Sequence, residues 1–237
     1  MSESQGWTIS SDRPDYADDV STAPVGVLQV ESGYRYSRVT TEKQHTLGEW
    51  MLRTGLSKRC DIRLGLNSYL HDGVSGWGDG SLDVRFRLLR PGDDEKPGSF
   101  SLTLITGTSL PTGSRQFSAR RLQPAVMLTS ALTLNGRAML APFVNYSLQS
   151  SPEGQFSEFS AGSSFICDLG KTLSWYLEGY STVTEAGFGQ DKGFAGSGFL
   201  WLVRDNLQLD VHAVTALNGP SPDYSVGAGL SFFFTVR

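Results

Sequence analysis

Apolar and polar residues alternate strictly along two neighbouring stretches in the first third of the chain. Between residues 60 and 67, Ile62, Leu64 and Leu66 take one set of alternate positions, and polar or charged residues take most of the other. Residues 44–54 repeat the pattern, and a short link at 55–59 joins the two stretches. Because successive side chains of a strand point to opposite faces, a period of two predicts a β-hairpin over residues 44–70 with one apolar and one polar face.

The same alternation continues to the end of the chain and predicts twelve strands in all. Asn135–Gly136 between two of them is a strong signal for a tight hairpin turn. Connections after even-numbered strands are mostly short, whereas those after odd-numbered strands are mostly longer and polar. The strands are expected at residues 27–39, as a pair within 44–70, and at 82–89, 100–108, 125–133, 138–148, 156–167, 173–183, 194–203, 207–215 and 224–234.

Two kinds of fold share this pattern: a soluble sheet with its polar face in water, and a membrane barrel with apolar residues towards lipid. Short connections at one end and long ones at the other are typical of outer-membrane barrels, and a soluble sandwich has no reason to sort them. Trp50, Trp175 and Trp201 lie near short turns, as in an aromatic girdle. We therefore expect an all-β fold in the bacterial outer membrane: a closed antiparallel transmembrane β-barrel with up-and-down topology.

The two ends of the chain carry separate signals. Residues 1–24 are polar and are expected to be either a flexible tail or a plug in the lumen, with the barrel formed by 25–237. The sequence contains no signal peptide, so we take it as a mature form. Gly229, Phe232 and Phe234 resemble the C-terminal signal that the outer-membrane assembly machinery recognises. The expected partners are that machinery during insertion, the lipid bilayer and small-molecule solutes, and the barrel is expected to be a monomer.

Composition narrows the possible functions. The chain has 237 residues, of which 39% are hydrophobic and 19% charged, and no apolar run approaches the length of a membrane-spanning helix. A net charge of −4 and the lack of a basic stripe argue against nucleic acid as a partner. Cys60 and Cys167 fall on the apolar faces of distant strands, so no disulfide is expected.

If the polar faces point inward, the two sides of the lumen differ in charge. The first four strands contribute arginines and acids, whereas strands eight to eleven contribute acids without Arg or Lys. This asymmetry would set a field across a pore, although the same charges could instead pair and brace the wall. Asp61 and Glu49 are expected to neutralise Arg63. Because no basic residue is expected on the flanking strands, Glu178 is expected to lack a bracing partner. The expected pore-lining residues are Glu31, Arg35, Glu49, Arg53, Asp61, Arg63, Asp83, Arg85, Arg87, Glu158, Tyr176, Glu178, Tyr180, Asp210 and His212.

Catalytic and metal-binding patterns do not stand out. His45 and His71 lie near loop ends, and no serine nucleophile is placed beside Asp210 and His212. The spacing of His and Cys does not match a zinc site. We therefore expect no enzymatic activity, no metal and no cofactor.

Several segments, taken in order, resemble a known family. Residues 9–16, which contain Asp12, Arg13, Pro14 and Asp15, are similar to the N-terminal motif of the outer-membrane transporters named after the meta-cleavage pathway of phenol degradation. The resemblance implies a small outer-membrane barrel that passes small molecules. Its other parts are residues 29–34, 53–59, 109–114, 206–210 and 217–224.

The sequence thus predicts an outer-membrane channel for the passive uptake of small organic solutes. The alternative is a barrel that does not conduct, because charges and the N-terminal segment fill its narrow lumen, and that has a structural or assembly role. A soluble β-protein is the third possibility, and a need for detergent would exclude it.

Overall fold

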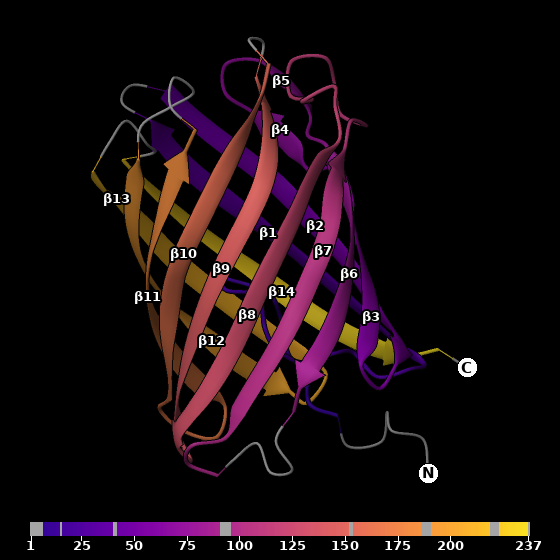
Figure 1. The fold of residues 1–237 in the computed structure, drawn as a ribbon, viewed down its shortest axis with the longest axis vertical. Coiled ribbons are helices and arrows are strands. Elements are labelled where there is room, and N and C mark those ends of the chain that lie inside the picture. Colours follow the sequence, from indigo (N-terminus) through magenta and orange to yellow (C-terminus); the bar gives the residue numbers. More distant parts are fainter. Residues whose placement is uncertain are drawn as a thin grey trace.

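The computed structural model describes residues 7–14, 16–39, 42–90, 96–151, 154–185, 191–218 and 223–236. No helix in this part of the chain is long and apolar enough to span a membrane. The strands (Figure 1) are β1 (Val27–Val39), β2 (Glu42–Ser57), β3 (Cys60–Gly65), β4 (Tyr69–His71), β5 (Ser75–Trp77), β6 (Gly80–Leu89), β7 (Phe100–Leu110), β8 (Gln123–Asn135), β9 (Ala138–Ser151), β10 (Gly154–Asp168), β11 (Leu173–Thr184), β12 (Lys192–Arg204), β13 (Leu207–Asn218) and β14 (Tyr224–Thr235).

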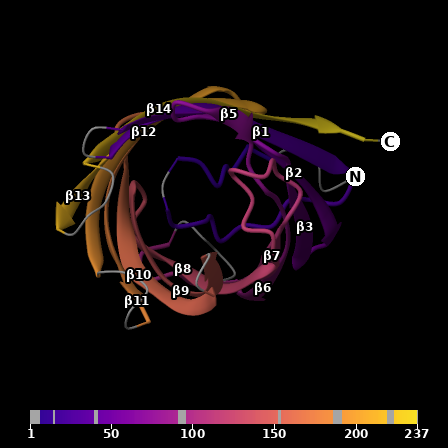
Figure 2. The same ribbon diagram turned by 90° about the horizontal axis from the view of Figure 1, so that it is seen from above.

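The strands form one antiparallel sheet that closes on itself. Sequential long strands pair with each other, and β1 pairs with both β2 and β14. The closed ring has twelve strands, because β4 and β5 form a small hairpin that extends from β3 and β6 and pairs with β2 through β4. Figure 2 shows the ring from above. The predicted closed barrel is confirmed, and closure leaves no unpaired edge along the wall.

The third predicted strand is interrupted, where the sequence suggested one continuous run. β3 ends at Gly65 and β4 begins at Tyr69, and both pair with β2. On β2, Gly48 and Glu49 lie opposite this gap with φ angles of 101° and 39°. The register between β1 and β2 shifts at the same place. This is a β-bulge, which breaks the ladder locally, and alternation of apolar residues does not reveal it.

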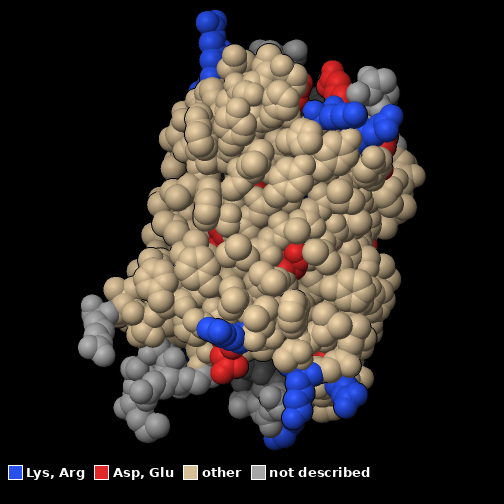
Figure 3. Space-filling model, turned by 180° about the vertical axis from the view of Figure 1, so that it is seen from behind, with Lys and Arg blue, Asp and Glu red and all other residues tan. Residues whose placement is uncertain are grey.

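Apolar side chains face outward and charged side chains face inward, as the alternation predicts. Leu64 is 38% exposed and Phe86 is 41% exposed, whereas Arg53, Asp61 and Arg85 are each 0% exposed. Figure 3 shows the result on one side of the molecule, where Lys and Arg gather towards the two ends and uncharged residues cover most of the belt between them. The apolar belt is the surface that lipid covers.

The two ends of the barrel differ. The start of β1, the end of β14 and the short turns after β2, β8, β10 and β12 lie at one end, which is the periplasmic end in barrels of this type. There Ile9, Val27 and Phe233 form an apolar cluster, with Trp7 against Phe233 at a ring distance of 4.7 Å. The connections after β7, β11 and β13 lie at the other, extracellular end. β6 ends and β7 begins at the periplasmic end, so the long connection between them is an exception. Both cysteines are free.

Candidate functional site

The polar N-terminal residues lie inside the barrel. The backbone N–H of Ile9 donates to the carbonyl oxygen of Asp205 at the turn between β12 and β13. From there the chain runs up to Tyr16 and returns to Val25, which forms a bridge with Gly55 of β2. Figure 2 shows this segment within the ring of strands. We call residues 7–14 and 16–24 the luminal segment.

Asp12 lies at the centre of an ion-pair network between the luminal segment and the wall. Its Oδ1 lies 2.5 Å from Arg85 Nη2, and its Oδ2 lies 3.0 Å from Arg63 Nη1 and 3.8 Å from Arg53 Nη1. Burial by itself raises the pKa of Asp12, but the attraction of the three guanidinium groups, Arg85 first, outweighs it and holds the pKa of Asp12 well below its ordinary value. Asp12 therefore stays ionised and neutralises an arginine cluster formed by β2, β3 and β6.

The register of the strands explains why this cluster needs an external acid. Arg53 and Arg63 lie directly opposite each other on β2 and β3, and like charges in that position repel. Arg63 has Asp18 of the luminal segment at 3.0 Å and Asp83 at 3.8 Å. The luminal segment therefore supplies two of the carboxylates that compensate the arginines.

The predicted partners of Arg63 are wrong. Asp61 instead accepts from Arg53 Nε at 2.7 Å and from the backbone N–H of Ala23. Glu49 pairs with Arg13 at 2.7 Å and with Arg35 at 2.9 Å. The physical reason is that alternation assigns a face but no diagonal neighbours, and the acids that reach Arg63 come from another element.

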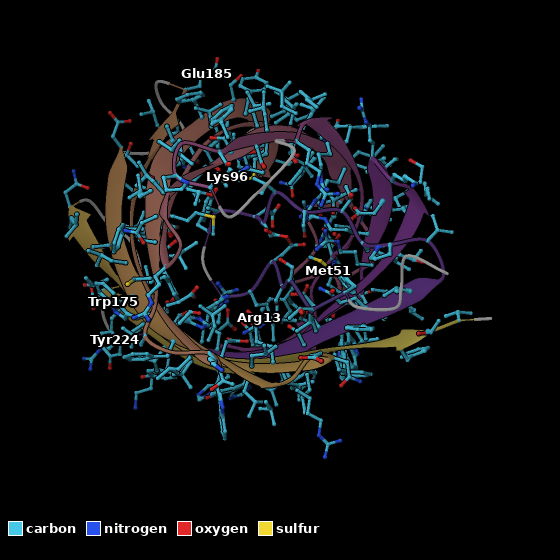
Figure 4. The ribbon with its side chains drawn as sticks, turned by 90° about the horizontal axis from the view of Figure 1, so that it is seen from below. Arg13, Met51, Lys96, Trp175, Glu185 and Tyr224 are labelled. Carbon is cyan, nitrogen blue, oxygen red and sulfur yellow. The ribbon has the colours of Figure 1, made fainter. Side chains whose placement is uncertain are left out.

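Arg13 crosses from one wall to the other. Besides Glu49, its Nε lies 3.3 Å from Asp210 Oδ2. Its guanidinium lies over Gly33 of β1 and Gly229 of β14, which are directly opposite each other, and a Cβ at either glycine would clash with it. Figure 4 shows Arg13 against this part of the wall. The two glycines thus form a hollow that only the absence of side chains permits.

Tyr16 fastens the upper part of the luminal segment to the acidic wall. Its backbone N–H donates to Glu178 Oε2 at 2.8 Å. Its ring stacks on Tyr180 at 4.4 Å, and Tyr180 stacks on Phe194 at 4.7 Å. Glu178 was expected to lack a bracing basic partner, and the group that contacts it is instead a main-chain donor of the N-terminal segment, which the sequence could not indicate.

The acidic wall also contains a basic residue. β12 begins at Lys192, directly opposite the buried Thr182 of β11. The prediction placed the start of this strand at residue 194 and so left Lys192 out. The prediction that this wall has no Arg or Lys is thus wrong, because the strand starts two positions earlier.

The remaining predicted residues also lie along the inner wall. Glu31 is 1% exposed and accepts hydrogen bonds from Ser11 Oγ and from the backbone N–H of Asp12. His212 Nδ1 lies 3.7 Å from Asp210 Oδ1. Glu158 faces the lumen from β10, and Tyr176 is fully buried on β11. Arg87 lines a cavity near the periplasmic end of the barrel. Asp15 lies outside the described residues.

Two of the cavities that border the luminal segment lie along its arms. One of about 580 Å³ opens near the periplasmic end, lined in part by Trp7, Lys58 and Arg90. The other, of about 230 Å³, lies between the two arms of the segment and the opposite wall, where Met139 and Gln208 contribute to its lining. No group of three or more His, Cys, Asp or Glu within the described ranges is placed to hold a metal ion.

A family comparison identifies the relatives of this barrel. Residues 11–234 match the family described as "Putative MetA-pathway of phenol degradation". The chain belongs to this family. No curated protein matches the chain.

Solved structures of outer-membrane channels share the fold. The COG4313 outer membrane channel from Pseudomonas putida F1 has a TM-score of 0.72 and 14% identity, over 95% of this chain and 100% of that one. The NanC porin has a TM-score of 0.60 and 10% identity, over 86% and 98%. The KdgM porin has a TM-score of 0.58 and 8% identity, over 86% and 99%. The family member described here is thus an outer-membrane β-barrel with the fold of channels and porins.

The sequence interpretation missed three residues of this network. Asp18, Tyr16 and Gln29 contact the wall or its charges, through Arg63, Glu178 and Glu31 respectively. A signal existed for two of them. Gln29 alternates with Glu31 on the inward face, and Asp18 belongs to an acid-rich run that faces an arginine-rich wall. For Tyr16 no local pattern indicated its position.

Proposed function

We propose that the protein is a channel for the passive uptake of small organic solutes, with a lumen narrowed by its own N-terminal segment. The observation that carries this proposal is how the luminal segment is attached. Between Ser10 and Ser21 it is held largely by ion pairs and hydrogen bonds that involve wall side chains, and not as a strand of the sheet. These contacts lie outside the hydrogen-bonded ladder of the wall, so breaking them unpairs no strand of the ring. The segment can therefore shift while the barrel stays folded.

An aromatic surface on the inner wall supports solutes that contain a ring. Phe143, Tyr180 and Phe194 lie close together on β9, β11 and β12, with Tyr16 between the first two. Tyr16 and Tyr180 are stacked with an interplanar angle of 22°. A planar solute ring could take the place of Tyr16 with the same offset-stacking preference. The family description refers to phenol degradation, and a phenol has the ring and hydroxyl of a tyrosine side chain.

A barrel that does not conduct is the second candidate. It is favoured by the dense part of the network, where Arg53 and Arg85 are fully buried and the side chain of Asp12 is 3% exposed. If the lumen is filled at the depth of this network, solutes do not cross it, and the barrel has a structural or assembly role. Both candidates share the proposed monomeric state and the same partners, namely the lipid bilayer and the outer-membrane assembly machinery during insertion.

Conductance separates the two candidates. The full chain and a variant that lacks residues 1–20 are reconstituted in planar bilayers, and liposome swelling is measured with 4-hydroxybenzoate as the solute. We expect the full chain to conduct weakly and the deletion to conduct several times more. The deletion should still fold, because the twelve strands close without the segment and water can hydrate the exposed arginines.

Tyr16→Ala is a milder variant that keeps every charge, and Tyr34→Ala, on the outer face, is its matched control. Heat-shifted gel mobility verifies folding of each variant. A folded full chain and a folded deletion that both fail to conduct would establish the non-conducting barrel. Equal conductance of the two would show that the segment does not narrow the lumen.

A further inference from the structure

The cavity of about 230 Å³ lies between the two arms of the luminal segment and the wall formed by β8 to β13. We call this space the inner cavity. Its lining is largely apolar, and the segment contributes Val20 to it. The apolar side chains of the wall that line it are Ala131 on β8, Met139 and Ala141 on β9, Ile166 on β10 and Leu200 on β12.

The size of the inner cavity suits a single ring. An apolar cavity of about 150 Å³ binds benzene. A cavity of about 230 Å³ therefore has room for one ring with a short side group. Such a ring would bury its apolar surface against Met139, Ile166 and Leu200, and this burial favours binding.

The position of the inner cavity suits a solute on its way through the barrel. Ala141 lies two positions from Phe143 along β9, or about 7 Å, and Phe143 belongs to the aromatic surface on the inner wall. At its other side the inner cavity shares Ala131 and Met139 with the larger cavity near the periplasmic end. The inner cavity thus lies between the aromatic surface and the periplasmic end of the lumen.

The charged side chains around the inner cavity favour a neutral ligand. Arg13 and Asp18 already form ion pairs with the walls. Asp19 and Asp168 accept hydrogen bonds from serine side chains and keep their negative charge. An anion would be repelled by these carboxylates, and a cation would have to leave water for a largely apolar space.

Gln208 on β13 provides a polar contact in the lining of the inner cavity. The residue is 7% exposed, and its Nε2 has no hydrogen-bond partner in the described part of the chain. A buried amide group without a partner costs free energy, and a ligand that bonds with it removes this cost. Because a hydroxyl group both donates and accepts, it can bond with either end of the amide. A water molecule would satisfy the amide but would not cover the apolar lining, whereas a ring with a hydroxyl group does both.

We propose that the inner cavity is a binding site for neutral solutes that carry one ring and one hydroxyl group. The hydroxyl group bonds with the amide of Gln208, and the ring lies against the apolar side chains of β9, β10 and β12. The site rests on the proposed function for the way in which its ligand arrives, since the solute enters from the lumen. It adds to that function a class of solute and a residue, Gln208, that selects for the hydroxyl group.

The methyl group of Met139 reports on the site directly. The full chain carries ¹³C at its methionine methyl groups and is titrated in detergent micelles with 4-methylphenol, and NMR spectra are recorded. Met139→Leu assigns the signal. We expect the Met139 signal to shift and to saturate, whereas the signal of Met51, on β2, stays in place.

Gln208→Leu keeps a side chain of similar length and removes the amide. It should weaken the binding of 4-methylphenol about tenfold, as expected for the loss of one hydrogen bond. The binding of toluene, which has the same ring and methyl group without the hydroxyl, should not weaken. The matched control is Gln149→Leu on the lumen-facing side of β9, where Gln149 bonds with Gln123 and Ser147; it should bind 4-methylphenol as the original chain does.

Ala141→Leu fills the inner cavity without changing a polar group. It should abolish the binding of both ligands, and it serves if Gln208→Leu does not fold, which heat-shifted gel mobility shows. A Met139 signal that does not saturate would overturn the proposal, and so would an equal loss of 4-methylphenol and toluene binding in folded Gln208→Leu. Tighter binding of benzylamine, a cation at neutral pH, would overturn the neutral class of ligand.

Failure of the site and failure of the channel give different results. If the full chain conducts and the Met139 signal does not respond, the site is wrong and the channel is unaffected. If neither the full chain nor the deletion of residues 1–20 conducts while Met139 of the full chain still responds, the channel is wrong and the binding site is retained.

Discussion

Neighbouring residues of one strand have opposite surroundings in this protein. Leu64 is 38% exposed on the outer face of β3, and Arg63 beside it is 5% exposed within the luminal network. An apolar side chain towards lipid and a charge towards paired acids are both stable, and exchanging them makes both costly. At the residue scale, the face on which a side chain lies decides which substitutions that position tolerates.

Leu64→Arg tests that assignment. We expect it to lower the free energy of unfolding by about 2–4 kcal/mol, because the charge faces hydrocarbon, whereas Leu64→Ala should cost much less. Urea-induced unfolding in lipid vesicles, followed by heat-shifted mobility, provides the measurement. If Leu64→Arg folds normally and Gly65→Arg does not, the inward and outward faces are reversed.

At the scale of elements, the luminal segment depends on where the strands lack side chains. Gly33 and Gly229 are paired across β1 and β14, and Arg13 fills the space above them. The same two strands close the barrel. The pair of strands that closes the barrel therefore also holds the luminal segment, at Gly33 and Gly229.

Gly229→Val should displace Arg13 without removing any charge. We expect a cost of about 1–3 kcal/mol from overpacking and a severalfold rise in conductance, because Arg13 loses its contacts with Glu49 and Asp210. The control is Ala228→Val, one position along β14 on the outer face, which should leave conductance unchanged. Single-channel recordings measure both, and equal effects of the two variants would contradict the role of the hollow.

At the scale of the whole molecule, the two sides of the lumen differ in charge. On β2, β3 and β6 the arginines are compensated by wall acids together with Asp12 and Asp18. On the opposite side Glu178 accepts from a main-chain N–H, which leaves its negative charge in place. The described part of the lumen therefore combines a compensated arginine cluster with a carboxylate that attracts cations.

Glu178→Gln isolates that charge, because the amide oxygen can still accept from the N–H of Tyr16. We expect the reversal potential in a salt gradient to shift towards lower cation preference, with little change in stability. Asp205→Asn, at an exposed periplasmic turn, is the control. An unchanged reversal potential in a pore that still conducts would show that Glu178 does not act on the passing ions.

Much of the fold could be predicted from local sequence. The tight turn between β8 and β9 follows from Asn135–Gly136, and the inward face of Arg53, Asp61 and Arg85 follows from alternation alone. The reason is physical: in lipid, each side chain of a strand meets either hydrocarbon or the lumen, so the two-residue period is a strong constraint. The β-bulge at Gly48 and Glu49 could not be predicted from the alternation, because it breaks the two-residue period within a single strand.

The sequence by itself therefore determined the barrel, its strand count and the inward face of most charged wall residues. Only the tertiary structure decided which inward charges meet. Asp12 and Arg63 are 51 residues apart, and Tyr16 and Glu178 are 162 residues apart, so no local pattern connects them. These contacts exist because closure of the barrel places strands that are distant in sequence around the same luminal segment, close enough for its side chains to reach them. The carboxylates of that segment lie where the arginines of the wall would otherwise repel one another.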